Sequence, residues 1–167
     1  KHATEAGINP IVGCELYTND LYHTDHEKFL DLKKGSVDVI GDAGEHLDKS
    51  AAANNHTLVY AKNYEGVKNL LNVSNKSFDT FYRKPLSSME NVYNTLDSNN
   101  IITTGCLQSK WNQYILAGRE DEALKLIKKY HDKFGDDFYL EIQLNNLDIQ
   151  MQCNNFYHKV YEKTGIK

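Results

Sequence analysis

The stretch "HTLVYAKNYEGVKNLL", residues 56–71, decides the fold class because it places a strand directly before a helix. Residues 58–61 form a short apolar run that predicts a buried strand. Beyond residue 63, apolar side chains recur at the three- and four-residue spacing of an amphipathic helix. The apolar positions of this predicted helix are Val67, Leu70, Leu71 and Val73.

The same alternation of strand and helix continues on both sides of this stretch. Further strands are predicted at residues 10–18, 100–107 and 137–144. A second helix is predicted over residues 119–135, with acids in its first turn, lysines in its last turn and a glycine at its end, which suit the helix dipole and the C-cap. Its apolar face comprises Ala123, Leu124, Ile127, Tyr130 and Phe134.

Strands that alternate with helices indicate an α/β fold with parallel strands, either as an open sheet or as a closed barrel. In such folds the chemistry lies at the carboxyl ends of the strands. Residues 21–55 interrupt the alternation with a long polar stretch, which predicts a surface insertion rather than a second domain. We therefore expect one α/β domain over residues 1–167.

Both ends of the chain have the pattern of interrupted elements. Gly7 and Pro10 follow what resembles the last turns of a helix. At the other end, a helical pattern stops at Gly165, and Ile166 has the character of a strand opening. We expect the chain to be an internal piece of a larger domain.

Composition limits the setting and the partners. The 167 residues are 40% hydrophobic and carry a net charge of -4, so contact with nucleic acid would need a local basic patch or bound cations. Cys14, Cys106 and Cys153 form no CxxC pair and no apolar leader precedes them, which indicates a reducing, cytoplasmic location. No apolar run approaches the ~20 residues of a membrane helix, so no membrane contact is expected.

Three residues at strand ends are candidate metal ligands. Glu15 follows the apolar run of the first predicted strand, His56 opens the second and Cys106 closes the third. A carboxylate, an imidazole and a thiol are all zinc ligands, and a barrel could bring them to one mouth. The alternatives are structural: Glu15 faces solvent, His56 bonds a carbonyl group, and Cys106 is a small buried apolar residue.

Other polar residues admit two readings each. The run "HTDHE", residues 23–27, is either a solvated loop or an isolated metal site. Glu141 and Gln143 alternate with apolar residues as in a partly exposed strand, which favours a structural role. Arg83 and Lys84 are cations that could contact phosphates.

Several blocks together resemble one known family. "GINPIVGCE", "AKNYEGVKNLL" and "FGDDFYLEIQ" occur in the same order as in the polymerase and histidinol phosphatase (PHP) domain of bacterial family C replicative DNA polymerases, the alpha subunits of DNA polymerase III. "FYRKP" and "IITTGCLQSKWNQYILAGREDEAL" lie in order between them. The resemblance covers nearly the whole chain apart from residues 21–55.

The resemblance implies a fold and a site. The fold would be a distorted seven-stranded β/α barrel, of which residues 1–167 would form the central part, without the first and last strands and without polymerase palm, fingers or thumb. The family's metal ligands correspond to Glu15, His56 and Cys106, holding divalent ions, with zinc in first place and manganese or magnesium as alternatives. The family's HxH and DxH ligands would fall outside these residues.

The resemblance also implies alternative functions. The first is a metal-dependent phosphoesterase, a 3′–5′ proofreading exonuclease, within a DNA-directed DNA polymerase. The second is a degenerate structural module that supports the polymerase and docks a separate proofreading exonuclease; a freestanding histidinol phosphatase is the third. The implied partners are DNA, the sliding clamp and a proofreading exonuclease. No catalytic base and no organic cofactor site can be assigned.

Overall fold

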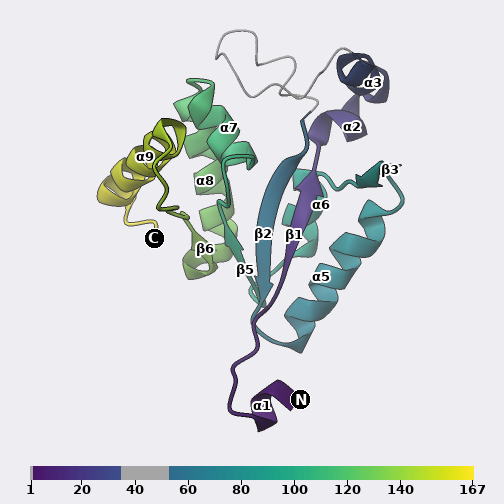
Figure 1. Ribbon diagram of the computed structural model, residues 1–167, viewed down its shortest axis with the longest axis vertical. Coiled ribbons are helices and arrows are strands. Elements are labelled where there is room, and N and C mark those ends of the chain that lie inside the picture. Colours follow the sequence, from purple (N-terminus) through teal and green to yellow (C-terminus); the bar gives the residue numbers. More distant parts are fainter. Residues whose placement is uncertain (1, 35–52) are drawn as a thin grey trace.

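A computed structural model describes residues 2–34 and 53–167 and shows a mixed α/β fold built on a four-stranded sheet (Figure 1). The strand order is β1-β2-β5-β6, and a separate two-stranded hairpin consists of β3 (Phe81–Tyr82) and β4 (Lys84–Pro85). The four strands of the main sheet are β1 (Val12–Thr18), β2 (Asn55–Ala61), β5 (Asn100–Thr103) and β6 (Phe138–Tyr139).

Helices follow or separate these strands. They are α1 (His2–Glu5), α2 (Asp20–Thr24), α3 (His26–Lys34), α5 (Tyr64–Ser77), α6 (Met89–Thr95), α7 (Lys110–Leu116), α8 (Glu120–Phe134) and α9 (Asp148–Thr164), with the 3-10 turn η1 (Gly135–Asp137). Of the strand predicted over residues 137–144, only β6 forms, because the chain leaves the sheet after Tyr139.

The expectation of parallel strands is wrong for two of the three pairs. β1 and β2 are antiparallel, as are β2 and β5, whereas β5 and β6 are parallel. The connection from β2 to β5 explains the second pair, because it contains two helices, α5 and α6 (Figure 1). The chain therefore crosses the helical layer twice and enters β5 from the end at which it left β2.

The two helices predicted from sequence are present. α8 buries Ala123, Ile127, Tyr130 and Phe134, and Gly135 follows it with a φ of 54°. α5 buries Leu70 and Val73, but Leu71 is 57% exposed, so its predicted place on the buried face is wrong. Leu71 lies just outside the apolar stripe of α5 that faces the sheet.

The sheet has one buried and one open face. Along β1, Leu16 and Thr18 are buried while Glu15 is exposed, and along β2, Thr57 and Val59 are buried between partly exposed neighbours. The buried face packs on α5, α7 and α8, and Met89 of α6 contacts Thr18 and Thr57. The largest core side chains in the described residues include Trp111, Tyr130, Tyr157, Phe138, Ile102 and Ile127.

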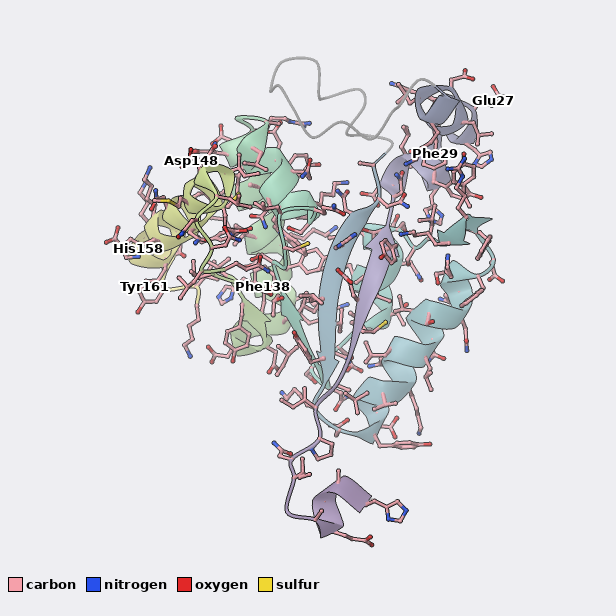
Figure 2. All side chains as sticks on the ribbon, in the orientation of Figure 1. Glu27, Phe29, Phe138, Asp148, His158 and Tyr161 are labelled. Carbon is pink, nitrogen blue, oxygen red and sulfur yellow. The ribbon has the colours of Figure 1, made fainter. Side chains whose placement is uncertain are left out.

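The predicted polar insertion at residues 21–55 begins as helix. Its first part forms α2 and α3, and Phe29 of α3 is fully buried against Leu86 in a small second cluster (Figure 2). The run "HTDHE", residues 23–27, accordingly spans the junction of two helices rather than a loop. Residues 35–52, which make up most of the rest of that predicted insertion, lie outside the described residues.

The ends agree with the local patterns. Gly7 follows α1 with a φ of 75°, and Gly165 follows α9 with a φ of 73°, a left-handed conformation that glycine adopts without strain. Figure 2 shows His158 and Tyr161 on the outer side of α9, where Tyr161 is 53% exposed. After Gly165, Ile166 is buried and the carbonyl oxygen of Lys167 accepts a hydrogen bond from the Leu140 N–H.

Candidate metal centre

Glu15 and His56 meet on the open face of the sheet. In the antiparallel register of β1 and β2, Glu15 pairs with Leu58 and Tyr17 pairs with His56, so the two side chains are diagonal neighbours. A carboxylate oxygen of Glu15 lies 2.7 Å from Nδ1 of His56. The side chain of His56 is 16% exposed and that of Glu15 is 45% exposed, which leaves the pair accessible from solvent on the Glu15 side.

Cys106 reaches the same point from a loop that follows β5. Gly105 turns this loop with a φ of 65°, and the Sγ atom of Cys106 then lies 3.5 Å from Nδ1 of His56. One donor atom from each of Glu15, His56 and Cys106 lies within 4.8 Å of the other two. Among the residues that the structure describes, these three make the one such group of potential metal ligands.

The donor set fits a zinc ion. A carboxylate, an imidazole nitrogen and a thiolate are its usual ligands at about 2.0–2.3 Å, which puts tetrahedral ligand atoms about 3.3–3.8 Å apart. Side-chain shifts of about 1 Å therefore convert the present arrangement into a three-ligand shell with one open position. Magnesium and calcium prefer oxygen donors alone, so the thiol and imidazole favour zinc over them.

The other cysteines lie elsewhere. Cys14 adjoins Glu15 in β1 but points to the opposite face, where burial and then the charge of Glu15 raise its pKa. Cys153 is fully buried in α9, and burial raises the pKa of this thiol to about 12. Only Cys106 among the three described cysteines thus shares a site with other potential ligands.

The remaining polar candidates do not join the cluster. Glu141 accepts hydrogen bonds from Thr103 Oγ1 at 2.6 Å and from Gln143 Nε2 at 2.8 Å, in line with the structural reading. Lys84 lies with its Nζ 3.7 Å from the ring centroid of Tyr17.

Two further sets of contacts were missed in the sequence. The ring of Tyr17 contacts His56 edge-on at 4.8 Å between centroids, so Lys84, Tyr17 and His56 form a continuous row. Asp20 forms an ion pair with Lys110 and accepts a hydrogen bond from the Met89 N–H. No sequence signal links these residues, because strand register and helix packing bring them together.

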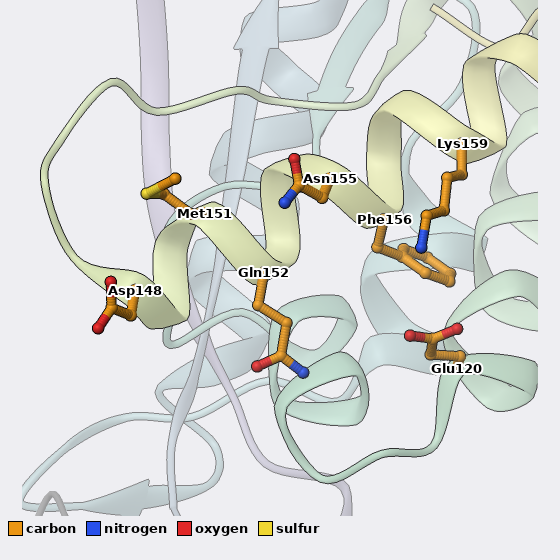
Figure 3. Close-up of a pocket in the computed structure, with 7 residues that line it drawn as sticks. All are labelled: Glu120, Asp148, Met151, Gln152, Asn155, Phe156 and Lys159. Atoms are coloured by element: carbon orange, nitrogen blue, oxygen red, sulfur yellow. The ribbon is translucent and has the colours of Figure 1, made fainter.

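A surface pocket lies apart from the metal ligands. It has a volume of about 360 Å³ and lies between α9 and the start of α8 (Figure 3). Its lining residues are Glu120, Asp148, Met151, Gln152, Asn155, Phe156 and Lys159. None of them belongs to the Glu15, His56 and Cys106 group.

The described part of the chain contains no helix with the length and apolar character needed to cross a membrane.

The sequence of the chain is similar to those of known proteins. The chain is 32% identical to DNA polymerase III subunit alpha of Aquifex aeolicus (strain VF5) over 162 residues, 96% of this chain and 13% of that protein. It is 30% identical to the protein of the same name from Borreliella burgdorferi (strain ATCC 35210) over 99% of this chain and 13% of that protein. The match to the subunit of Saccharopolyspora erythraea is 29% identical over the whole chain and 14% of the relative.

The chain spans about an eighth of the length of these relatives. The family model described as the PHP domain matches residues 1–145, which include all three potential ligands. The chain belongs to the PHP domain family.

Proposed function

We propose that this chain is part of the PHP domain of a DNA polymerase III alpha subunit, and that Glu15, His56 and Cys106 hold a divalent metal ion there. The convergence of three ligand types from β1, β2 and the loop after β5 carries the proposal. The names of the relatives support the parent protein. The sheet would form part of a distorted seven-stranded barrel, within a cytoplasmic DNA-directed DNA polymerase that acts in replication.

Zinc is the first candidate metal, with manganese and magnesium as alternatives. A bound metal would activate water and neutralise charge on a phosphodiester. The chain's own residues would hold that ion: His56 from the start of β2, Glu15 from mid-strand, and Cys106 from its loop. Lys84, beside Tyr17, would place a cation near an incoming phosphate.

The activity we propose is hydrolysis of a phosphodiester at a DNA 3′ end, as in a 3′–5′ proofreading exonuclease. The Glu15 side chain is 45% exposed, and this exposed side would admit the DNA end. DNA would be the substrate, and the sliding clamp and a separate proofreading exonuclease would be partners of the whole subunit.

One observation favours the alternative of a structural module. The three donors come from three separate segments, β1, β2 and the loop after β5, so a bound ion would cross-link them whether or not it takes part in hydrolysis. In this alternative the metal would hold β1, β2 and the β5 loop together, and the domain would support the polymerase or dock a separate exonuclease.

Metal binding is tested by titrating the metal-free protein with Zn²⁺ against a chromophoric chelator. We expect one ion per chain and a loss of affinity in Glu15→Gln and Cys106→Ser. Cys14→Ser is the matched control, because this thiol adjoins Glu15 but faces the other side of β1. Equal affinity in all variants would remove the assignment of the ligands.

Hydrolysis is tested on the whole alpha subunit with a primer that has a mismatched 3′ end, without nucleotides. The exonuclease proposal predicts cleavage that falls at least about 100-fold in Cys106→Ser, with DNA synthesis retained. Stoichiometric metal without any cleavage by the wild-type subunit would instead favour the structural module.

A further inference from the structure

The side chain of Asn112 forms hydrogen bonds with the two backbone carbonyl groups that flank the Cα atom of Cys106. Its side-chain Nδ2 donates to the carbonyl oxygen of Cys106 at 2.8 Å and to that of Gly105 at 3.3 Å. Asn112 belongs to α7 and has no exposed surface. The two carbonyl groups are therefore held by a group that water cannot replace without opening the core.

Tyr157 fixes the orientation of this amide. The Tyr157 hydroxyl donates to Oδ1 of Asn112 at 2.7 Å, across from α9. Burial raises the pKa of Tyr157, so its hydroxyl stays protonated and remains a donor. Because carbonyl oxygens only accept, the NH₂ group of Asn112 must face the loop and its oxygen must face Tyr157.

The far end of the loop is tied to the strand that carries His56. Gln113 Nε2 donates to the carbonyl oxygen of Leu107 at 2.8 Å. The next carbonyl, that of Gln108, accepts from the backbone N–H of His56 at 3.1 Å and from Asn55 Nδ2 at 3.2 Å. Four successive carbonyl groups are thus bonded, and the loop has little freedom to move relative to His56.

We propose that Asn112, oriented by Tyr157, is a positioning residue that sets the distance of the Cys106 thiol from His56 and thereby tunes the metal centre. The inference rests on the proposed metal site and adds a residue that touches no metal. Without the two hydrogen bonds, the loop gains conformations in which Sγ points away from the other two ligands. Binding then has to restrict those conformations, which weakens metal affinity.

The chain offers a closely matched control in Asn100. This asparagine is also fully buried, its Nδ2 donates to the carbonyl oxygens of Gly66 at 3.0 Å and Tyr60 at 3.5 Å, and its Oδ1 accepts from Asn69. It lies at the start of β5, whereas the Cys106 loop follows the other end of that strand. Asn100→Ala therefore removes the same kind of hydrogen bonds without touching the loop.

The experiment is a Co²⁺ titration of the full-length protein, because Co²⁺ takes the place of zinc and its thiolate charge-transfer band reports a Co–S bond. We expect the band in wild type and in Asn100→Ala. Asn112→Ala should bind Co²⁺ about tenfold more weakly or show a weaker charge-transfer band at saturation. Circular dichroism and thermal unfolding of both variants show whether their folds are comparably affected.

A second pair of variants serves if Asn112→Ala does not fold. Tyr157→Phe removes the hydroxyl that orients Asn112 and keeps the ring, and Tyr130→Phe removes an equally buried hydroxyl that donates to the Met89 carbonyl oxygen at 3.1 Å. We expect weaker Co²⁺ binding in Tyr157→Phe alone.

The outcomes separate the two proposals. A wild-type protein without a charge-transfer band overturns the metal centre and this inference together. If the wild-type protein shows the band and Asn112→Ala binds Co²⁺ with the same affinity and band as Asn100→Ala, the positioning role is overturned and the metal centre stands. If Asn112→Ala is unfolded, equal Co²⁺ binding by Tyr157→Phe and Tyr130→Phe leads to the same conclusion.

Discussion

The Nδ1 atom of His56 lies 2.7 Å from a carboxylate oxygen of Glu15, across the antiparallel pairing of β1 and β2. The same nitrogen lies 3.5 Å from the thiol of Cys106, so one atom is the meeting point of all three side chains. A metal ion at this point would be in reach of a carboxylate, an imidazole and a thiol together.

Zinc should stabilise the folded protein through this site. At a free concentration about 100 times the dissociation constant, the gain in the free energy of unfolding is about 2.7 kcal/mol, which for a chain of this size raises Tm by about 5–10 °C. The shift should vanish in Cys106→Ser and persist in Cys14→Ser. Differential scanning fluorimetry with and without chelator measures it, and an unchanged shift in Cys106→Ser would contradict the site.

Trp111→Ala should be among the most destabilising single changes in the core. Trp111 is fully buried, with ring centroids 5.1 Å from Tyr130 and 5.9 Å from Phe138. Removing the indole should lower the free energy of unfolding by about 3–5 kcal/mol. Urea unfolding measures this, with Leu144→Ala, at a residue that is 95% exposed, as a control expected to change it by less than about 0.5 kcal/mol.

Gly66→Ala should destabilise the protein, although alanine normally favours a helix interior by about 1 kcal/mol. A Cβ at this position in α5 would lie 2.3 Å from the carbonyl oxygen of Asn99 and 3.1 Å from the Cα of Ala61. Both are backbone atoms, so the helix must move away from the end of β2 and from the residue that precedes β5, at a cost of about 1–3 kcal/mol. A rise in stability in urea unfolding would show that α5 does not pack this closely.

Alkaline pH should weaken the fold through buried groups that hold their protons. The pKa of Cys153 is raised from its ordinary value of 9.0 to about 12 by burial. The contribution of this protonated thiol to the free energy of unfolding is therefore complete below pH 9. It is lost as the pH rises toward 12, with a slope of up to about 1.4 kcal/mol per pH unit for one proton. Burial also raises the pKa of Tyr130 and Tyr157, which adds to the loss above about pH 10.

Urea unfolding at a series of pH values measures this dependence. Cys153→Ala should remove the part of the decline that begins near pH 9 and leave the part due to the tyrosines. A stability that stays constant from pH 8 to 11 in the wild-type protein would contradict the prediction.

Local patterns predicted elements but not their directions. α8 could be predicted because its apolar spacing, charged ends and Gly135 are all properties of one short segment. The directions of β1, β2 and β5 depend on how many helices the connections contain and how these pack, and no short segment carries that information. Leu71 illustrates the same limit, since helical spacing cannot tell how wide a stripe the sheet will cover.

The candidate site was predictable in its members but not in its geometry. Glu15 lies in the middle of β1, Cys106 follows the end of β5 and His56 lies near the start of β2, so a parallel pairing of β2 and β5 would have separated His56 from Cys106. Because β2 and β5 are in fact antiparallel, the start of β2 lies beside the end of β5, and His56 comes close to Cys106. Asn112 and Tyr157 gave no signal, because a buried polar residue in an amphipathic helix is recognised only through the partner that satisfies it.

The bonded carbonyl groups of residues 105–108 have a consequence for divergence among related chains. Asn112, Gln113 and the His56 N–H each donate a hydrogen bond to a particular carbonyl group of the loop. One inserted or deleted residue would therefore leave a carbonyl group without its partner and turn the Cys106 side chain away from His56. We expect homologous chains to differ in length between β1 and β2 and to keep the spacing from Gly105 to Gln108 fixed.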